Sequence, residues 1–171
     1  MGLHSGAYSH IQYAAPQPFD AHSTVLTGNN APDAAPEPCS YAGRSVLLIA
    51  GIANPLPLVN YISDSGAQNV TTLSFADHHA FTVKDALRIN QAWQKLLDGM
   101  SPDARPALAV TTQKDATRLQ TLIPHLAPTL RRALCVQPIT VEISVNAQYS
   151  PTFNQIIIHY VSQNSRNSRV D

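Results

Sequence analysis

Three short runs rich in apolar or β-branched residues, each followed by a loop and a helical pattern, constrain this chain more than any other feature. The runs are Ser45–Ala50 (SVLLIA), Asn69–Phe75 (NVTTLSF) and Ala107–Thr111 (ALAVT). Runs of this length are typical of strands buried in a parallel sheet. Repeated strand-loop-helix units place their strands in one sheet and their helices on its faces. The sequence therefore predicts an α/β fold with a mostly parallel sheet and flanking helices.

Helix signals follow each of the three runs. Pro55 and Gly66 mark the start and the end of a helix after the first run. After the second run, Thr82 and Asp85 resemble a capping pair, and the apolar pattern that follows continues for about four turns. A short helix is expected from Ala116, after the third run.

The two ends of the chain show different patterns. His10–Ala15 (HIQYAA) is a candidate strand, and Pro16 and Pro18 after it suit the edge of a sheet. Ile139–Val145 alternates apolar and polar residues, which predicts an amphipathic strand. The spacing of apolar residues over 153–161 predicts a C-terminal helix.

The length and a change in composition suggest how the chain is organised. A chain of 171 residues suits one compact domain with loose ends. Asn29–Ser40 is rich in Pro, Ala and Asn and has no helical or strand period, as in a linker. We expect residues 1–40 to form an N-terminal strand and a partly disordered linker, and residues 41–171 to form a C-terminal α/β domain.

Charge and cysteine content exclude several classes of protein. Charged residues make up 13% of the chain and the formal net charge is zero, which argues against electrostatic binding of nucleic acid. No apolar run reaches the roughly 18 residues of a membrane span. Cys39 and Cys135 are far apart and lack metal-ligand spacing, so we interpret them as ordinary thiols in a reducing, cytoplasmic compartment.

The triplet Asp77-His78-His79 stands between the second predicted strand and the following helix, and three interpretations compete for it. It can be a loop that caps the helix. An Asp-His contact can instead fix the imidazole tautomer for acid-base work. Metal binding would need further carboxylates or imidazoles, and the chain has no D-x-D or H-x-x-x-H spacing, so we expect no metal site.

Two further loops follow the other predicted strands. In Thr112-Gln113-Lys114-Asp115, Lys114 can face a phosphate while the Thr hydroxyls position it, but a plain strand-to-helix loop explains the pattern equally well. Gly51–Pro55 is better explained as a tight turn, with Asn54 as its candidate for ligand contact. The carboxyl ends of parallel strands share one edge, so we expect all three loops to face one crevice. The chain contains no G-x-x-x-x-G-K-[ST] phosphate loop.

Taken together, three ordered segments resemble the C-terminal half of tetraacyldisaccharide 4'-kinase, the lipid A 4'-kinase of Gram-negative bacteria. The segments are VLLIAGIANPLPLVNYI, LSFADHHAFTVKDALRI and ALAVTTQKDATRL. The closing FNQIIIHYVSQNSRN resembles the family's Bacteroidetes-type members, and His10–Phe19 resembles the strand that leads into this half. The resemblance covers roughly Ser45 to the C-terminus.

The resemblance implies an activity and a set of partners. The family transfers the γ-phosphoryl group of ATP, with Mg²⁺, to the 4'-hydroxyl of a lipid A disaccharide precursor at the cytoplasmic face of the inner membrane. Its phosphate loop, its magnesium-binding carboxylates, a catalytic Asp and a membrane-associated segment belong to an N-terminal half that this chain lacks. We therefore expect ATP and Mg²⁺ to bind mainly to that half, and the isolated chain to be inactive.

The resemblance also implies roles for individual residues. His78 corresponds to the family His that pairs with the catalytic Asp of the N-terminal half, and Asp77 would orient His78. The family's T-E-K-D motif becomes Thr112-Gln113-Lys114-Asp115, with one negative charge fewer. His79, Thr112, Lys114, Asp115 and Asn54 are the candidates for positioning substrate or phosphate. The alternatives are a metal-dependent phosphoesterase of the Asp-His-His type and a non-catalytic interaction domain.

Overall fold

The computed structural model describes residues 7–19 and 39–145, which belong to two compact units. The larger unit spans Tyr13–Ile139. The smaller unit contains strands from both ends of the described region, where β1 (Ala7–Tyr13) pairs with β7 (Ile139–Val145) in a two-stranded sheet. Both terminal strands are therefore confirmed, although β1 begins and ends earlier than predicted. The predicted helix over 153–161 and most of the predicted linker lie outside the described residues.

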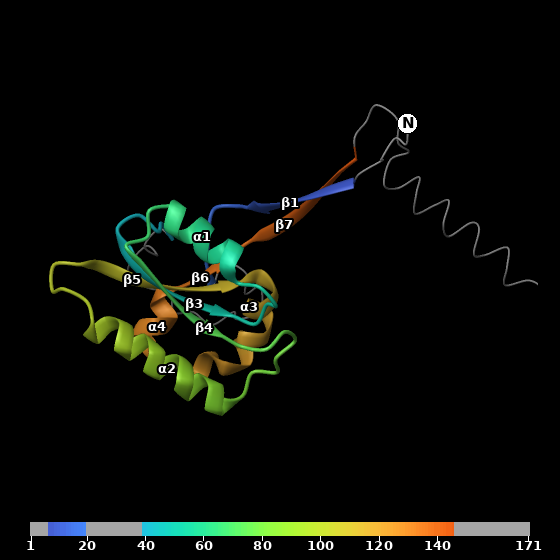
Figure 1. Ribbon diagram of the computed structural model, residues 1–171. Helices are drawn as coiled ribbons and strands as arrows, with labels where there is room; N and C mark the ends of the chain where they lie inside the picture. Colours follow the sequence, from blue (N-terminus) through green and yellow to red (C-terminus); the bar gives the residue numbers. More distant parts are fainter. Residues whose placement is uncertain (1–6, 20–38, 146–171) are drawn as a thin grey trace, which may run out of the picture. The chain divides into compact units, whose positions relative to one another are not determined.

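The larger unit is built on a five-stranded, mostly parallel sheet in the order β2-β6-β5-β3-β4 (Figure 1). Its four parallel strands are β3 (Arg44–Ala50), β4 (Asn69–Ser74), β5 (Arg105–Thr112) and β6 (Leu134–Gln137). At one edge, the short strand β2 (Gln17–Pro18) runs antiparallel to β6. The predicted fold class, including its antiparallel edge strand, is confirmed.

Helices cover both faces of this sheet. The elements after β3 are α1 (Leu56–Asp64), α2 (Val83–Asp98), α3 (Gln113–Leu119), the 3-10 helix η2 (Gln120–His125) and α4 (Pro128–Ala133). The helix α1 lies on the opposite side of the sheet from α2 and α4 (Figure 1). No helix in the described part of the chain combines the length and the apolar character needed to cross a bilayer.

The central strand β3 is buried on both faces because its side chains alternate between two cores. Leu47 and Ile49 pack in one core with Trp93 of α2. Leu48 packs in the other with Leu58 of α1. Burying one such aliphatic side chain stabilises the fold by roughly 1.5–3 kcal/mol. This two-sided burial explains the continuous apolar run, and it fixes where the strand ends and its loop begins.

The order of the strands creates a switch point between β3 and β5. From β3 the chain passes to β4 on one side, then crosses back to β5 on the other side. The connections that leave the carboxyl ends of β3 and β5 therefore diverge. In open α/β sheets, ligands bind in the crevice at such a point.

Some elements were not predicted from the sequence. The helix α3 begins at Gln113 rather than Ala116, because the Thr112 side chain accepts a hydrogen bond from the Asp115 amide and caps the helix earlier. Neither α4 nor β6 was predicted. The strand β6 has only four residues and follows α4 directly, so no loop signal separates the two.

The interpretation of both cysteines as ordinary thiols is wrong. Cys39 and Cys135 form a disulfide, with 6.2 Å between their Cα atoms. Pairing of β6 with β5 places Cys135 in the same buried core as Cys39. This proximity depends on tertiary structure, which a separation of 96 residues does not reveal. The argument from free thiols for a reducing compartment no longer applies.

We predict that replacing Cys39 with Ser lowers the melting temperature of the oxidised protein. The bridge closes a loop of 96 residues, for which the chain-entropy model gives a stabilisation of up to about 4.7 kcal/mol. Thermal unfolding followed by circular dichroism, with and without a thiol reductant, checks this. The reduced wild type should match the reduced variant. Equal melting temperatures of the two oxidised proteins would contradict the prediction.

Candidate active site

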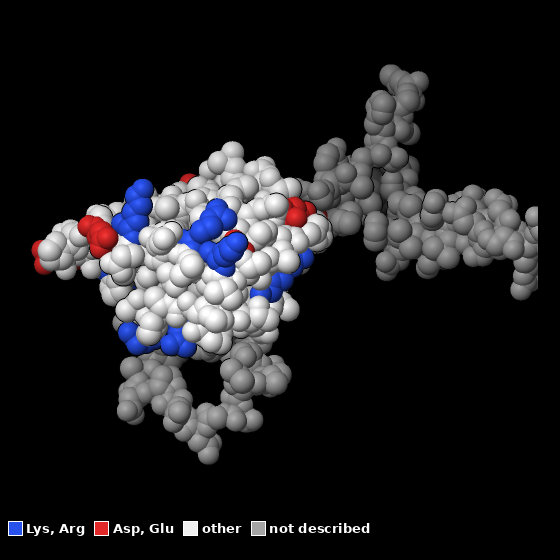
Figure 2. Space-filling view, turned by 90° about the horizontal axis from the view of Figure 1, so that it is seen from below, with Lys and Arg blue, Asp and Glu red and all other residues white. Residues whose placement is uncertain are grey.

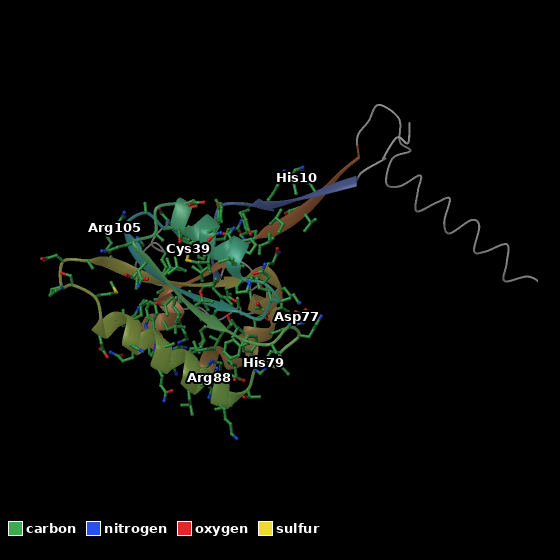
Figure 3. The ribbon with its side chains drawn as sticks, viewed as in Figure 1. His10, Cys39, Asp77, His79, Arg88 and Arg105 are labelled. Atoms are coloured by element: carbon green, nitrogen blue, oxygen red, sulfur yellow. A yellow bond between two sulfur atoms is a disulfide. The ribbon has the colours of Figure 1, made fainter. Side chains whose placement is uncertain are left out.

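The three predicted loops meet at the carboxyl edge of the sheet, where two polar contacts join them. The Gly51 amide donates to Asp115 Oδ2 over 2.8 Å, which links the loop after β3 to α3. Lys114 Nζ lies 2.7 Å from Asp77 Oδ1, which links α3 to the loop after β4. Asp77 and His79 lie at this end of the sheet, away from Arg105, where β5 begins (Figure 3). The predicted meeting of the loops at one edge is confirmed.

Asp115 is the buried centre of this arrangement. Its side chain is fully buried, and its Oδ2 accepts hydrogen bonds from the Gly51 amide and from the Thr112 hydroxyl, the latter over 3.0 Å. In return, the Asp115 amide donates to Thr112 Oγ1 over 3.1 Å. Asp115 and Thr112, both candidates for positioning phosphate, thus share an inward-facing contact that holds the start of α3 against the end of β3.

Gly51 permits this contact because it has no side chain. A Cβ atom at this position would lie 3.1 Å from Asp115 Oδ1 and 3.3 Å from the Ala76 carbonyl oxygen. Both distances are shorter than ordinary contacts, so a side chain would push the loops apart. Nearby, the exposed Asn54 accepts a hydrogen bond from the Leu56 amide over 3.1 Å at the start of α1. In this structure both residues shape the loop.

Asp77 carries the exposed negative charge of the site. Besides the Lys114 contact, its Oδ1 accepts a hydrogen bond from the His78 amide over 2.9 Å. The hydrogen bond from Lys114 is the main reason why the pKa of Asp77 lies below its ordinary value, and the His78 amide adds to the effect. Asp77 is therefore ionised at neutral pH.

His78 is the most accessible side chain of the triplet. Its side chain is 74% exposed, and its Nε2 lies 3.5 Å from Asp77 Oδ2. On the other side of the ring, Nδ1 lies 3.3 Å from Nη2 of Arg118 on α3. The backbone of His78 has a φ of 60°, in the left-handed region that non-glycine residues rarely adopt. Such a conformation is maintained by its surroundings and is common at functional sites.

His79 takes part in capping α2. Its Nε2 lies 2.9 Å from Asp85 Oδ2, which also accepts hydrogen bonds from the Thr82 amide and hydroxyl, each over 2.8 Å. The imidazole ring stacks on the buried Phe75, with 5.1 Å between ring centroids. Burial alone would raise the pKa of Asp85, but the bonds from His79 and Thr82 outweigh it and lower that pKa to about 2. The predicted capping pair of Thr82 and Asp85 is confirmed.

Arg118 is a site residue that was not predicted from the sequence. Its only sequence signal is its position three residues after Asp115 on α3, which places both side chains on one helix face. Its Nη1 lies 3.7 Å from Asp115 Oδ1, and its side chain is 29% exposed. Arg118 therefore stands between the buried carboxylate and the exposed imidazole.

The described residues offer no cluster of metal ligands around the site. Within residues 7–19 and 39–145, no group of three or more His, Cys, Asp or Glu side chains could hold a metal ion. Seen from the side of α2, basic side chains form small separate groups on a mostly uncharged surface (Figure 2). The metal-dependent phosphoesterase alternative thus receives no support from the described residues.

Comparison with known proteins gives one consistent result. The family described as "Tetraacyldisaccharide-1-P 4'-kinase" matches residues 5–160. A tetraacyldisaccharide 4'-kinase of Bacteroides fragilis is 40% identical over 126 residues, and the alignment covers 72% of this chain and 30% of the relative. The kinase of Bacteroides thetaiotaomicron is 40% identical over 123 residues, with the same coverage.

A more distant relative agrees with these two. The tetraacyldisaccharide 4'-kinase of Rhodopseudomonas palustris is 38% identical over 87 residues, which are 49% of this chain and 23% of the relative. The chain thus spans only about a third of the length of these relatives. No solved structure matches the chain significantly.

We predict that Asp115→Ala lowers the free energy of unfolding by roughly 2–4 kcal/mol. The change leaves the buried Gly51 amide and Thr112 hydroxyl without their acceptor. Asp115→Asn should cost less, because an amide oxygen can still accept from Gly51. Urea unfolding of the two variants measures the difference. Equal stability of Asp115→Ala and the wild type would contradict the bridging role.

We also predict a specific acid sensitivity that depends on Asp85. Its pKa is about 2 in the folded protein and near 3.8 when unperturbed, so its stabilising effect is complete above about pH 4 and is lost as the pH falls toward 2. Asp85→Asn should lower stability at pH 7 by roughly 1–2 kcal/mol and flatten the acid limb of the stability profile. Asp98→Asn, an exposed control on the same helix, should leave that limb unchanged. If the stability of Asp85→Asn falls with acid pH in parallel with that of the wild type, the role of Asp85 is refuted.

Proposed function

The chain belongs to the tetraacyldisaccharide-1-P 4'-kinase family, and from this premise we propose that it forms the C-terminal part of a lipid A 4'-kinase. In this proposal the enzyme transfers the γ-phosphoryl group of ATP to the 4'-hydroxyl of a tetraacyldisaccharide 1-phosphate. The match of the family over residues 5–160 is the observation that carries the proposal. An exposed histidine, His78 in the loop after β4, supports the proposal.

Phosphoryl transfer requires mainly positioning and charge stabilisation. His78 can serve the first need, because its imidazole is exposed and can reach a group outside this chain, with Asp77 Oδ2 3.5 Å from its Nε2. We propose that the group is the catalytic carboxylate of the N-terminal half, which takes the proton from the sugar hydroxyl. Among the candidates for positioning phosphate, Lys114 is the one with a half-exposed positive charge.

We propose that ATP and Mg²⁺ bind mainly to the N-terminal half of the kinase. This chain has no G-x-x-x-x-G-K-[ST] motif, and its alignment covers only 30% of the Bacteroides fragilis relative. The partners are then that N-terminal half, the lipid A precursor and the cytoplasmic surface of the inner membrane. It follows that the chain alone should not phosphorylate the substrate.

A complementation assay tests this proposal. The chain is combined with the separately expressed N-terminal part of the Bacteroides fragilis kinase, labelled ATP, Mg²⁺ and tetraacyldisaccharide 1-phosphate. We predict transfer of label only when both parts are present. His78→Gln should lower the rate by roughly 10²-fold, the usual lower range for loss of a residue that acts on proton transfer. His125→Gln, at another exposed histidine, should not lower it.

Two outcomes would contradict the proposal. Turnover by the chain alone would show that it carries a complete site. A mixture that stays inactive, although both parts are folded and bind each other, would favour a non-catalytic interaction domain. The intact Bacteroides fragilis kinase serves as the positive control in the same assay.

A further inference from the structure

Of the two ring nitrogens of His78, Nδ1 is the one that Arg118 contacts. Arg118 Nη2 lies 3.3 Å from His78 Nδ1. A guanidinium group is always charged in proteins and has only donors, so it cannot accept a hydrogen bond. Nδ1 must therefore be the acceptor and carry no proton while this contact exists. The remaining proton of the neutral ring then resides on Nε2.

At the other ring nitrogen, the Nε2–H remains available to donate a hydrogen bond. Asp77 Oδ2 is its neighbour at 3.5 Å, which is longer than the 2.7–3.2 Å of a normal N–H to oxygen bond. The side chain of His78 is also 74% exposed. An incoming carboxylate can thus accept from Nε2–H more closely than Asp77 does.

Arg118 is itself positioned by a second contact, with Asp115. Its Nη1 and Asp115 Oδ1 are both buried, have no hydrogen-bond partner, and lie 3.7 Å apart, so charge attraction holds them together. The carboxylate of Asp115 is in turn fixed by the Gly51 amide and the Thr112 hydroxyl. The guanidinium is therefore anchored on one side to a buried carboxylate at the switch point of the sheet.

From these contacts we propose that Arg118 is a positioning residue that keeps His78 in the Nε2–H tautomer. In that state His78 is a hydrogen-bond donor that orients a carboxylate, and it is not a proton acceptor, because Arg118 occupies the Nδ1 lone pair. The identity of that carboxylate rests on the proposed function. The tautomer and its dependence on Arg118 do not, so the two can fail separately.

Nitrogen NMR of the ¹⁵N-labelled chain tests the proposal without any activity. The His78 signals are assigned by their absence in His78→Gln. In the wild type at a pH where the ring is neutral, Nδ1 should show an unprotonated, pyridine-like shift and Nε2 a protonated, pyrrole-like shift. Arg118→Met should shift this distribution toward a mixture of tautomers. Lys114→Met, which removes a cation that contacts Asp77 instead of His78, should leave it unchanged.

The outcomes are decisive in both directions. A wild-type His78 with its proton on Nδ1 overturns the proposal even if Arg118→Met fails to fold. An unchanged tautomer in Arg118→Met also overturns it, provided that the variant is folded. An unchanged NMR signal of the Gly51 amide, which donates to Asp115, shows that the variant is folded at this site. In the complementation assay, Arg118→Met should lower kcat about tenfold and leave KM for ATP unchanged. If the wild-type mixture has no activity, the proposed function fails while the tautomer result still stands.

Discussion

The contact between the buried Asp115 carboxylate and the Gly51 amide is the interaction on which the rest of the site depends. It spans the switch point between β3 and β5, where the chain leaves neighbouring strands in different directions. This buried polar contact holds the loop after β3 against the start of α3. Because Gly51 has no side chain, its amide can approach the Asp115 carboxylate closely enough to donate a hydrogen bond.

From Asp115 outward, the charges alternate until they reach solvent. Arg118 lies against Asp115, and His78 lies against Arg118. Beyond His78, Asp77 pairs with Lys114, which is on the same helix as Arg118. The series starts at a buried, fixed group and ends at exposed ones. An imidazole held in this way is oriented by the core of the domain but can act on a partner outside it.

Features that depend on local spacing were predictable from the sequence. Alternating strands and helices predicted that the three loops would meet, and the Thr82-Asp85 spacing predicted a helix cap. The contact of Arg118 with His78 joins residues 40 apart, and its formation depends on how α3 packs beside the loop after β4. The disulfide likewise depends on where β6 pairs. His79 illustrates a further limit, because two adjacent histidines in one motif have different contacts, one with Arg118 and one with Asp85.

The central claim is that His78 is half of a site whose other half is a carboxylate outside this chain. Its most direct test is the ¹⁵N signal of His78 Nε2 as the separately expressed N-terminal part of the kinase is added to the labelled chain. The account predicts that this signal shifts on binding, while the signal of the control residue His125 does not. Binding of the two parts with no change at His78 Nε2 would contradict it.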